Sequence, residues 1–280
     1  MPLFALSLSL AACFGWGVAD FIGGVKSRHL PTLTVLTISN IFGVAMIFAL
    51  VCLRGRPLPA DPALWWAVGG GAAGIIAMFL LYKALAMGPM SIIAPVSSLG
   101  AMLPLAYGLS TGDTLSMFQA VGIPTAIVGT LLAIQEKNDG DKEKKITRGA
   151  WMALASALAV GCFLIIMDRA SAVDPYWSAL IMRSSYGVFL TPLVFFLRPP
   201  LRVGRLHLPA IIVLGVVDAL AGFAFALATT VGMLSLVAVV GSLYPAVTIL
   251  LSSLILRERL QPVQYTGVAL ALTGVVLISL

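Results

Sequence analysis

Long apolar segments follow one another along nearly the whole chain, and they restrict its possible folds more than any other feature. A bilayer core about 30 Å thick is crossed by roughly 20 apolar residues of helix. Because lipid offers no hydrogen-bond partner to a backbone amide, each segment is expected to be helical. The ten segments that meet this requirement are residues 3–25, 32–53, 63–87, 90–110, 116–135, 148–168, 175–197, 208–231, 234–256 and 261–280.

The composition leads to the same fold class. Of the 280 residues, 60% are hydrophobic and 10% are charged, whereas soluble domains carry about 25% charged residues. So few charged side chains cannot cover the surface of a soluble protein of this length. The sequence therefore predicts an all-α integral membrane protein with ten transmembrane helices, located in the cell membrane.

The net charge of +6 does not indicate nucleic-acid binding. The basic residues lie mostly between apolar segments, where cations face anionic lipid head groups. The three cysteines are isolated, which is typical of packing rather than of a disulfide framework or metal site. No phosphate-binding loop of the Gly-x-x-x-x-Gly-Lys-Ser/Thr type occurs. We therefore expect no cofactor, no metal and no nucleic acid, and membrane lipid as one partner.

The two halves of the chain are internally similar. At an offset of 144 residues, Gly88, Ser91, Ala94, Ser98 and Leu99 match Gly232, Ser235, Ala238, Ser242 and Leu243. After one inserted residue, Asp113, Leu115, Gln119, Gly122 and Gly129 match Glu258, Leu260, Gln264, Gly267 and Gly274. The expected domains are a first five-helix repeat at 1–135, a charged linker at 136–147 and a second five-helix repeat at 148–280.

An odd number of helices per repeat makes the second repeat enter the membrane from the opposite side. Such inverted repeats enclose a central cavity around a pseudo-two-fold axis in the membrane plane. Loops after the odd-numbered helices contain twelve Lys or Arg residues, against three in the other loops. The positive-inside rule therefore places the odd-numbered loops in the cytoplasm.

Two sequence blocks carry a family resemblance. Tyr82 to Ser91 (YKALAMGPMS) and Arg257 to Gly267 (RERLQPVQYTG), within the duplicated ten-helix plan, resemble the EamA family of drug/metabolite transporters. The resemblance covers nearly the whole chain, although Asp113 stands where such proteins commonly have Glu. It implies a basket of ten helices with a central cavity and secondary transport, often export of amino acids or related metabolites.

The candidate site begins with two ionisable residues near the predicted membrane centre. Arg183 and Asp218 lie about nine and eleven residues into their segments, where an unpaired charge is costly. The functional interpretation is a substrate anchor, in which Arg183 binds a carboxylate and Asp218 holds Arg183 or exchanges a proton. A static ion pair between helices is an equally weighted alternative. At the 144-residue offset their counterparts are Ser39 and Gly74, so these charges break the repeat symmetry.

Further candidates for substrate binding are polar or aromatic residues inside apolar segments. They are Trp16, Asp20, Asn40, Tyr82, Ser98, Ser242 and Tyr244. Hydrogen bonding between helices is the alternative role for the neutral polar ones, and Asp20 lies close enough to Lys26 and Arg28 to reach the interface instead. Pro95, Pro104, Pro124, Pro192 and Pro245 fall inside segments and permit kinks.

These features favour a secondary active transporter, acting as exporter or exchanger of a small polar metabolite such as an amino acid by alternating access. Protons or another coupling ion would drive it, and the protein would be a monomer or homodimer. The alternatives are a passive channel and an integral membrane enzyme. An enzyme is disfavoured because His29 and His207 are far apart in sequence and no His-Glu-x-x-His or Gly-x-Ser-x-Gly motif accompanies them.

Overall fold

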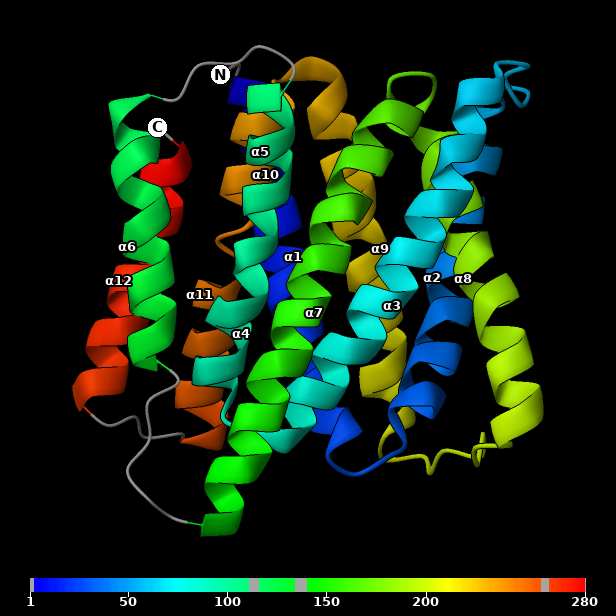
Figure 1. Cartoon of the computed structure of the whole chain (residues 1–280). Coiled ribbons are helices and arrows are strands. Elements are labelled where there is room, and N and C mark those ends of the chain that lie inside the picture. The colour runs from blue at the N-terminus through cyan, green and yellow to red at the C-terminus, as the bar shows by residue number, and fades with distance from the viewer. Residues whose placement is uncertain (1–2, 111–115, 134–139, 258–261, 280) are drawn as a thin grey trace.

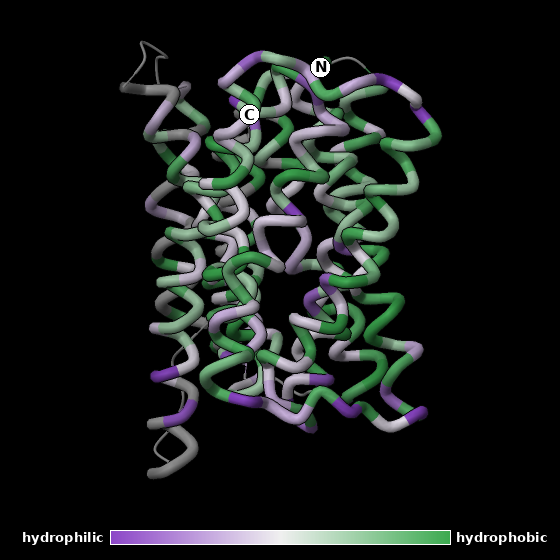
Figure 2. Tube along the Cα trace, turned by 90° about the vertical axis from the view of Figure 1, so that its right-hand side faces the viewer, coloured by the Kyte–Doolittle hydropathy of each residue, from purple (hydrophilic) through white to green (hydrophobic). Residues whose placement is uncertain are grey.

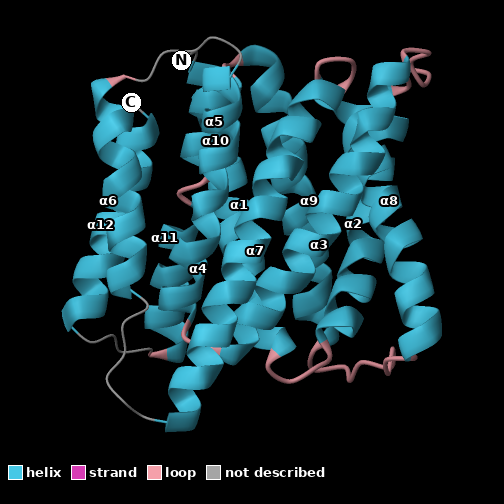
Figure 3. Cartoon of the chain, viewed as in Figure 1, coloured by secondary structure: helices cyan, strands magenta, loops and turns pink. Residues whose placement is uncertain are grey.

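The computed structural model describes residues 3–110, 116–133, 140–257 and 262–279, and within them it contains helices and no strand (Figure 3). The first half consists of α1 (Leu3–Ser27), α2 (Thr32–Arg54), the 3-10 turn η1 (Pro62–Trp65), α3 (Trp66–Met87), α4 (Met90–Ser98), the 3-10 turn η2 (Leu99–Ala101), α5 (Met102–Ser110) and α6 (Met117–Ala133). The second half consists of α7 (Gly140–Ser171), α8 (Pro175–Leu197), α9 (Leu208–Val231), α10 (Leu234–Gly241), α11 (Tyr244–Leu251), the π-helical turn η3 (Ser252–Leu256) and α12 (Pro262–Ser279).

The outer surface is apolar, as a lipid-facing surface must be. Within the described residues, six helices are long and apolar enough to cross a membrane. Large side chains on them are exposed, for example Leu53 at 84% and Phe196 at 78%, and Figure 2 shows hydrophobic residues along the helices with hydrophilic ones gathered toward the two ends. Trp65 and Trp66 are exposed at the start of α3, and Trp151 is exposed near the start of the apolar part of α7, as is typical of a membrane interface. The protein is thus a multi-pass integral membrane protein.

Two of the ten predicted segments are not single helices. Segment 90–110 is divided by η2, and segment 234–256 is broken at Ser242 and Leu243. Proline explains both breaks, because it lacks an amide donor and its ring collides with the carbonyl four residues earlier. In an unbroken helix, Pro104 would collide with the carbonyl of Gly100, and Pro245 with that of Gly241. Each proline lies in the first turn of the helix after the break, where it is well tolerated.

The linker region also differs from expectation. Helix α7 begins at Gly140, so the second part of the predicted 136–147 linker forms the first turns of this helix. Its apolar, membrane-crossing part begins only at Thr147, close to the predicted residue 148. Residues 134–139, like Asp113 and Glu258 of the repeat, lie outside the described residues.

The helices run in alternating directions (Figure 1). Helix α1 starts at the face where both termini lie, whereas α7 starts at the opposite face. Helix α1 packs on α9 and α7 packs on α3, while α2 contacts both α8 and α9. The paired helices α6 and α12 lie to one side of this group and touch it through α4 and α10.

Near the break in segment 234–256, a glycine allows two helices to approach each other closely. A Cβ on Gly17 of α1 would lie 2.5 Å from the Cβ of Val247 and 2.7 Å from the carbonyl oxygen of Tyr244. The Thr248 hydroxyl donates a hydrogen bond of 3.1 Å to the carbonyl oxygen of Gly17. The N-terminal turn of α11 is therefore held directly against α1.

Candidate functional site

A central cavity lies where the two discontinuous segments meet the other helices. It is lined by residues of both halves of the chain. Ser97, Ser98 and Ala101 line it beside one helix break, and Ser242 and Tyr244 line it beside the other. A broken helix leaves backbone groups without helical partners, so such breaks at membrane depth are tolerated where they face a cavity or are buried in protein.

The polar centre of the cavity is an ion pair between α8 and α9. Arg183 and Asp218 are buried, with 4% and 5% of their surfaces exposed, and the Arg183 Nη2 donates a hydrogen bond to Asp218 Oδ2. The guanidinium carbon lies 5.1 Å from the ring centroid of Tyr186. Among the described residues, the buried Arg183 Nε has no hydrogen-bond partner. The sequence suggested this pairing; a role in substrate binding stays a prediction.

Asp20 is the third charged residue on the cavity wall. It lies in α1, seven residues before Ser27, or roughly 10 Å from the helix end at 1.5 Å per residue. It is 4% exposed, so it does not reach the interface beside Lys26 and Arg28. Within the described part of the chain, no hydrogen bond or ion pair engages its carboxyl group, whereas Arg183 and Asp218 engage each other.

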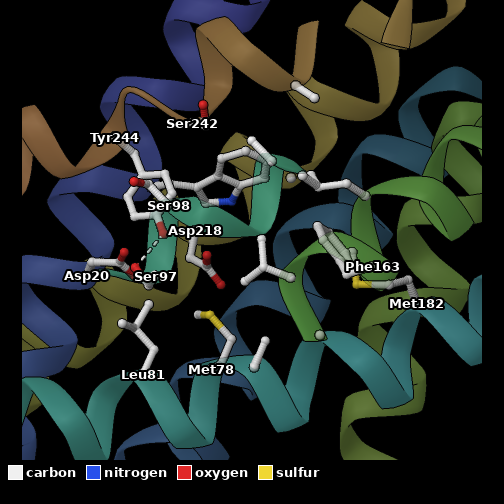
Figure 4. A pocket seen from close by; sticks show the side chains of 18 of the residues that line it. Asp20, Met78, Leu81, Ser97, Ser98, Phe163, Met182, Asp218, Ser242 and Tyr244 are labelled. Atoms are coloured by element: carbon white, nitrogen blue, oxygen red, sulfur yellow. Dashed lines mark hydrogen bonds between the residues drawn. The ribbon is translucent and has the colours of Figure 1, made fainter. Parts of the chain in front are cut away.

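A hydrogen bond joins the two discontinuous segments. The hydroxyl groups of Ser97 in α4 and Tyr244 in α11 are 2.7 Å apart, as Figure 4 shows by a dashed line. The Ser98 hydroxyl donates to the Pro95 carbonyl at 2.8 Å, which leaves its oxygen able to accept. The wall between α4 and α11 therefore has hydroxyl groups at both helix breaks.

Replacing Tyr244 by Phe is expected to lower the free energy of unfolding by about 1 kcal/mol, because it removes the hydrogen bond between the hydroxyl groups of Ser97 and Tyr244. The measurement is reversible unfolding of the purified protein in mixed micelles. Tyr265→Phe is the matched control, since Tyr265 is exposed. Equal stability of the two variants would contradict a contribution from this bridge.

Seven of the nine candidate residues line this cavity. They are Trp16, Asp20, Ser98, Arg183, Asp218, Ser242 and Tyr244. Trp16 also packs on Phe225, with 5.4 Å between ring centroids. Their part in substrate binding stays a prediction.

Asn40 and Tyr82 do not line the cavity. Both are buried, and a Cβ on Gly23 of α1 would lie 2.4 Å from the Tyr82 ring, which shows how tightly the ring is packed there. Asn40 lies beside Gly187 of α8. The Asn40 Oδ1 and the Tyr82 hydroxyl are buried and have no hydrogen-bond partner among the described residues.

Other lining residues were not among the candidates. Tyr186 lies three residues after Arg183 and thus on the same face of α8, a spacing that identifies it once Arg183 is chosen. Phe163, Met182 and Met78 also line the cavity, but apolar residues in an apolar segment give no sequence signal. Within the described residues, no group of three or more His, Cys, Asp or Glu is placed to hold a metal ion.

Comparison with known proteins gives a family match over both halves. The model of the EamA-like transporter family matches residues 3–135 and again residues 147–280. An uncharacterized protein of Methanocaldococcus jannaschii is 28% identical over 130 residues, which are 46% of this chain and 94% of that protein. That relative therefore corresponds in length to about one half of this chain.

A crystal structure of another protein shares the fold. It superposes with a TM-score of 0.70 at 17% sequence identity, covering 95% of this chain and 95% of the other. At this identity, the likeness concerns the arrangement of the helices alone.

Proposed function

The chain belongs to the EamA-like transporter family, and from this premise we propose that it is a secondary active transporter, exporter or exchanger, of a small polar metabolite such as an amino acid. Membership itself makes it a membrane transporter of the drug/metabolite type. The proposal adds the mechanism, which is alternating access to the cavity around Arg183 and Asp218.

The observation that carries the proposal is a cavity with ionisable walls inside an otherwise apolar bundle. Among its described lining residues, Asp20, Arg183 and Asp218 are charged. Ionisable residues within membrane segments are costly, and they mark solute and ion pathways. Apolar side chains at these positions would give the helix bundle equal or greater stability, so stability alone does not explain the charges. The charges therefore support binding of a polar solute or coupling ion.

Alternating access is further supported by how the two halves are arranged. With five helical segments per half, the two halves would cross the membrane in opposite directions. The opposite starting faces of α1 and α7 support this. The packing of α1 on α9 has its counterpart in the packing of α7 on α3. In an inverted repeat of this kind, an exchange of conformations between the halves turns an outward-open cavity into an inward-open one.

Counterflow in proteoliposomes tests the proposal. Vesicles loaded with one unlabelled compound from a panel of amino acids and related metabolites are diluted into the same compound with a label. A carrier accumulates label transiently because efflux of unlabelled solute drives exchange. Flux without such accumulation would indicate a passive channel, and chemical conversion of the compound would indicate an enzyme; either result overturns the proposal.

A further inference from the structure

The charges on the cavity wall do not balance. Asp20 and Asp218 contribute two carboxylates, against one guanidinium from Arg183. The ion pair with Asp218 already uses the guanidinium. With both carboxylates ionised, the described lining carries a net charge of −1, which a solute with a single positive charge would neutralise.

Asp20 is the group left without a counterion. It is 4% exposed and lines the cavity, and within the described residues no cation or hydrogen-bond donor engages it. Asp20 and Asp218 line the same cavity, so their carboxylates repel each other when both are ionised. A buried carboxylate of this kind is stabilised by a cation that enters the cavity and donates hydrogen bonds to it.

A carboxylate-bearing solute fits the cavity less well. It would have to displace Asp218 from Arg183 and would leave Asp218 buried without its partner, which is costly. It would also bring a third negative charge close to Asp20. The arrangement thus favours an ammonium group over a carboxylate at the polar side of the cavity.

The other side of the cavity is apolar. Figure 4 shows Asp20 and Ser97 on one side, and Phe163 and Met182 on the opposite side. Val160 and Leu164 of α7 also belong to the lining. A solute whose ammonium group reaches Asp20 would therefore place an aromatic or aliphatic body against α7 and α8.

We infer that the solute recognised by this cavity is an organic monocation with an apolar body, and that Asp20 binds its ammonium group. The inference rests on the proposed function, a carrier of a small metabolite, and replaces its example of an amino acid by a cation without a free carboxylate. Asp20 binds the cation, the Arg183–Asp218 pair excludes a free carboxylate, and the side chains around Phe163 accept the apolar part.

Three probes with nearly the same apolar body test the charge preference. They are 2-phenylethylamine, phenylalanine and 3-phenylpropionate, with net charges of +1, 0 and −1. Binding to the purified protein is measured by isothermal calorimetry and by the shift of the melting temperature. We expect the amine to bind at least about tenfold more tightly than phenylalanine, because the carboxylate of phenylalanine would be repelled by Asp20 or would have to displace Asp218 from Arg183. We expect 3-phenylpropionate not to bind.

The variant Asp20→Asn locates the ammonium site. It is expected to weaken amine binding by about tenfold or more and to abolish the amine-induced rise in melting temperature. Without ligand it should melt no lower than the wild type, because it removes a buried carboxyl group that has no partner among the described residues. Asp61→Asn is the matched control: Asp61 is exposed and its side chain accepts from the amide of Ala63, so amine binding should be unchanged.

Failure of this inference is distinguishable from failure of the proposed function. Counterflow of phenylalanine without binding of the amine would retain the carrier and overturn the monocation site. Equal binding of all three probes, or unchanged amine binding by Asp20→Asn, would also overturn it. If the amine binds through Asp20 but no compound shows counterflow, the site stands and the carrier mechanism falls.

Discussion

Replacing Arg183 by Gln is expected to reduce transport below detection and to lower the free energy of unfolding by about 3–5 kcal/mol, the usual cost of leaving one partner of a buried ion pair alone. The change leaves the Asp218 carboxylate in the cavity beside Asp20 with no guanidinium to neutralise it. Asp218→Asn is expected to abolish transport as well, because it leaves the Arg183 guanidinium buried without its counterion. Uptake into proteoliposomes and unfolding in mixed micelles measure the two effects, and protease protection in vesicles verifies insertion.

A double variant separates the two roles of this pair. Arg183→Met combined with Asp218→Leu removes both charges together, and such apolar replacements of buried ion pairs are often neutral or stabilising. We therefore expect stability to recover while transport stays absent. Transport by the double variant at the wild-type rate would show that the pair is only structural.

A second ion pair, between Arg54 and Asp174, provides the matched control for Arg183→Gln. Arg54 Nη1 lies 2.6 Å from Asp174 Oδ2 in a less buried position, outside the central cavity. Arg54→Gln should cost roughly 1 kcal/mol, since partly exposed pairs contribute little, and uptake should remain measurable. If Arg54→Gln lost as much stability and uptake as Arg183→Gln, the larger contribution assigned to the Arg183–Asp218 pair would be contradicted.

The helical membrane class was predictable because it depends on segment length and hydrophobicity. The helix breaks were harder to predict, since five prolines lie inside the predicted segments and only two have a break just before them. Pro124 and Pro192 lie within helices α6 and α8, which continue through them. Whether a helix bends or ends at proline depends on what its neighbours supply to the freed carbonyl groups. A single sequence does not contain that information.

Depth in the membrane was readable from the sequence, whereas the direction of each side chain was not. Arg183 and Asp218 are deep and opposite in charge, so their pairing followed from the cost of leaving either one alone. Tyr82 also carries a polar group, yet its neighbour Leu81 lines the cavity and Tyr82 does not. Successive side chains on a helix differ in direction by about 100°. A helix as apolar as α3 has no polar pattern that shows which of its faces points into the cavity. Asn40 is likewise outside the cavity lining, and its part in substrate binding stays a prediction.

Replacing Gly215 by Ala is expected to destabilise the protein by about 1–3 kcal/mol, the usual cost of overpacking. An added Cβ would lie 2.0 Å from the carbonyl oxygen of Ser39, and backbone in α2 cannot yield as a flexible side chain would. Helix α9 must then move away from α2 and take Asp218, three residues further on, with it. We expect lower uptake together with the loss of stability.

Gly69→Ala makes the same substitution where there is room, because the nearest atom to an added Cβ is 3.9 Å away. This control should keep its transport rate and gain roughly 0.5–1 kcal/mol, since alanine favours a helix over glycine. The contrast isolates the α2–α9 contact from the general effect of a methyl group in a helix. If both variants unfold at the same denaturant concentration and transport at the same rate, then the close approach of α2 and α9 does not hold Asp218 in place.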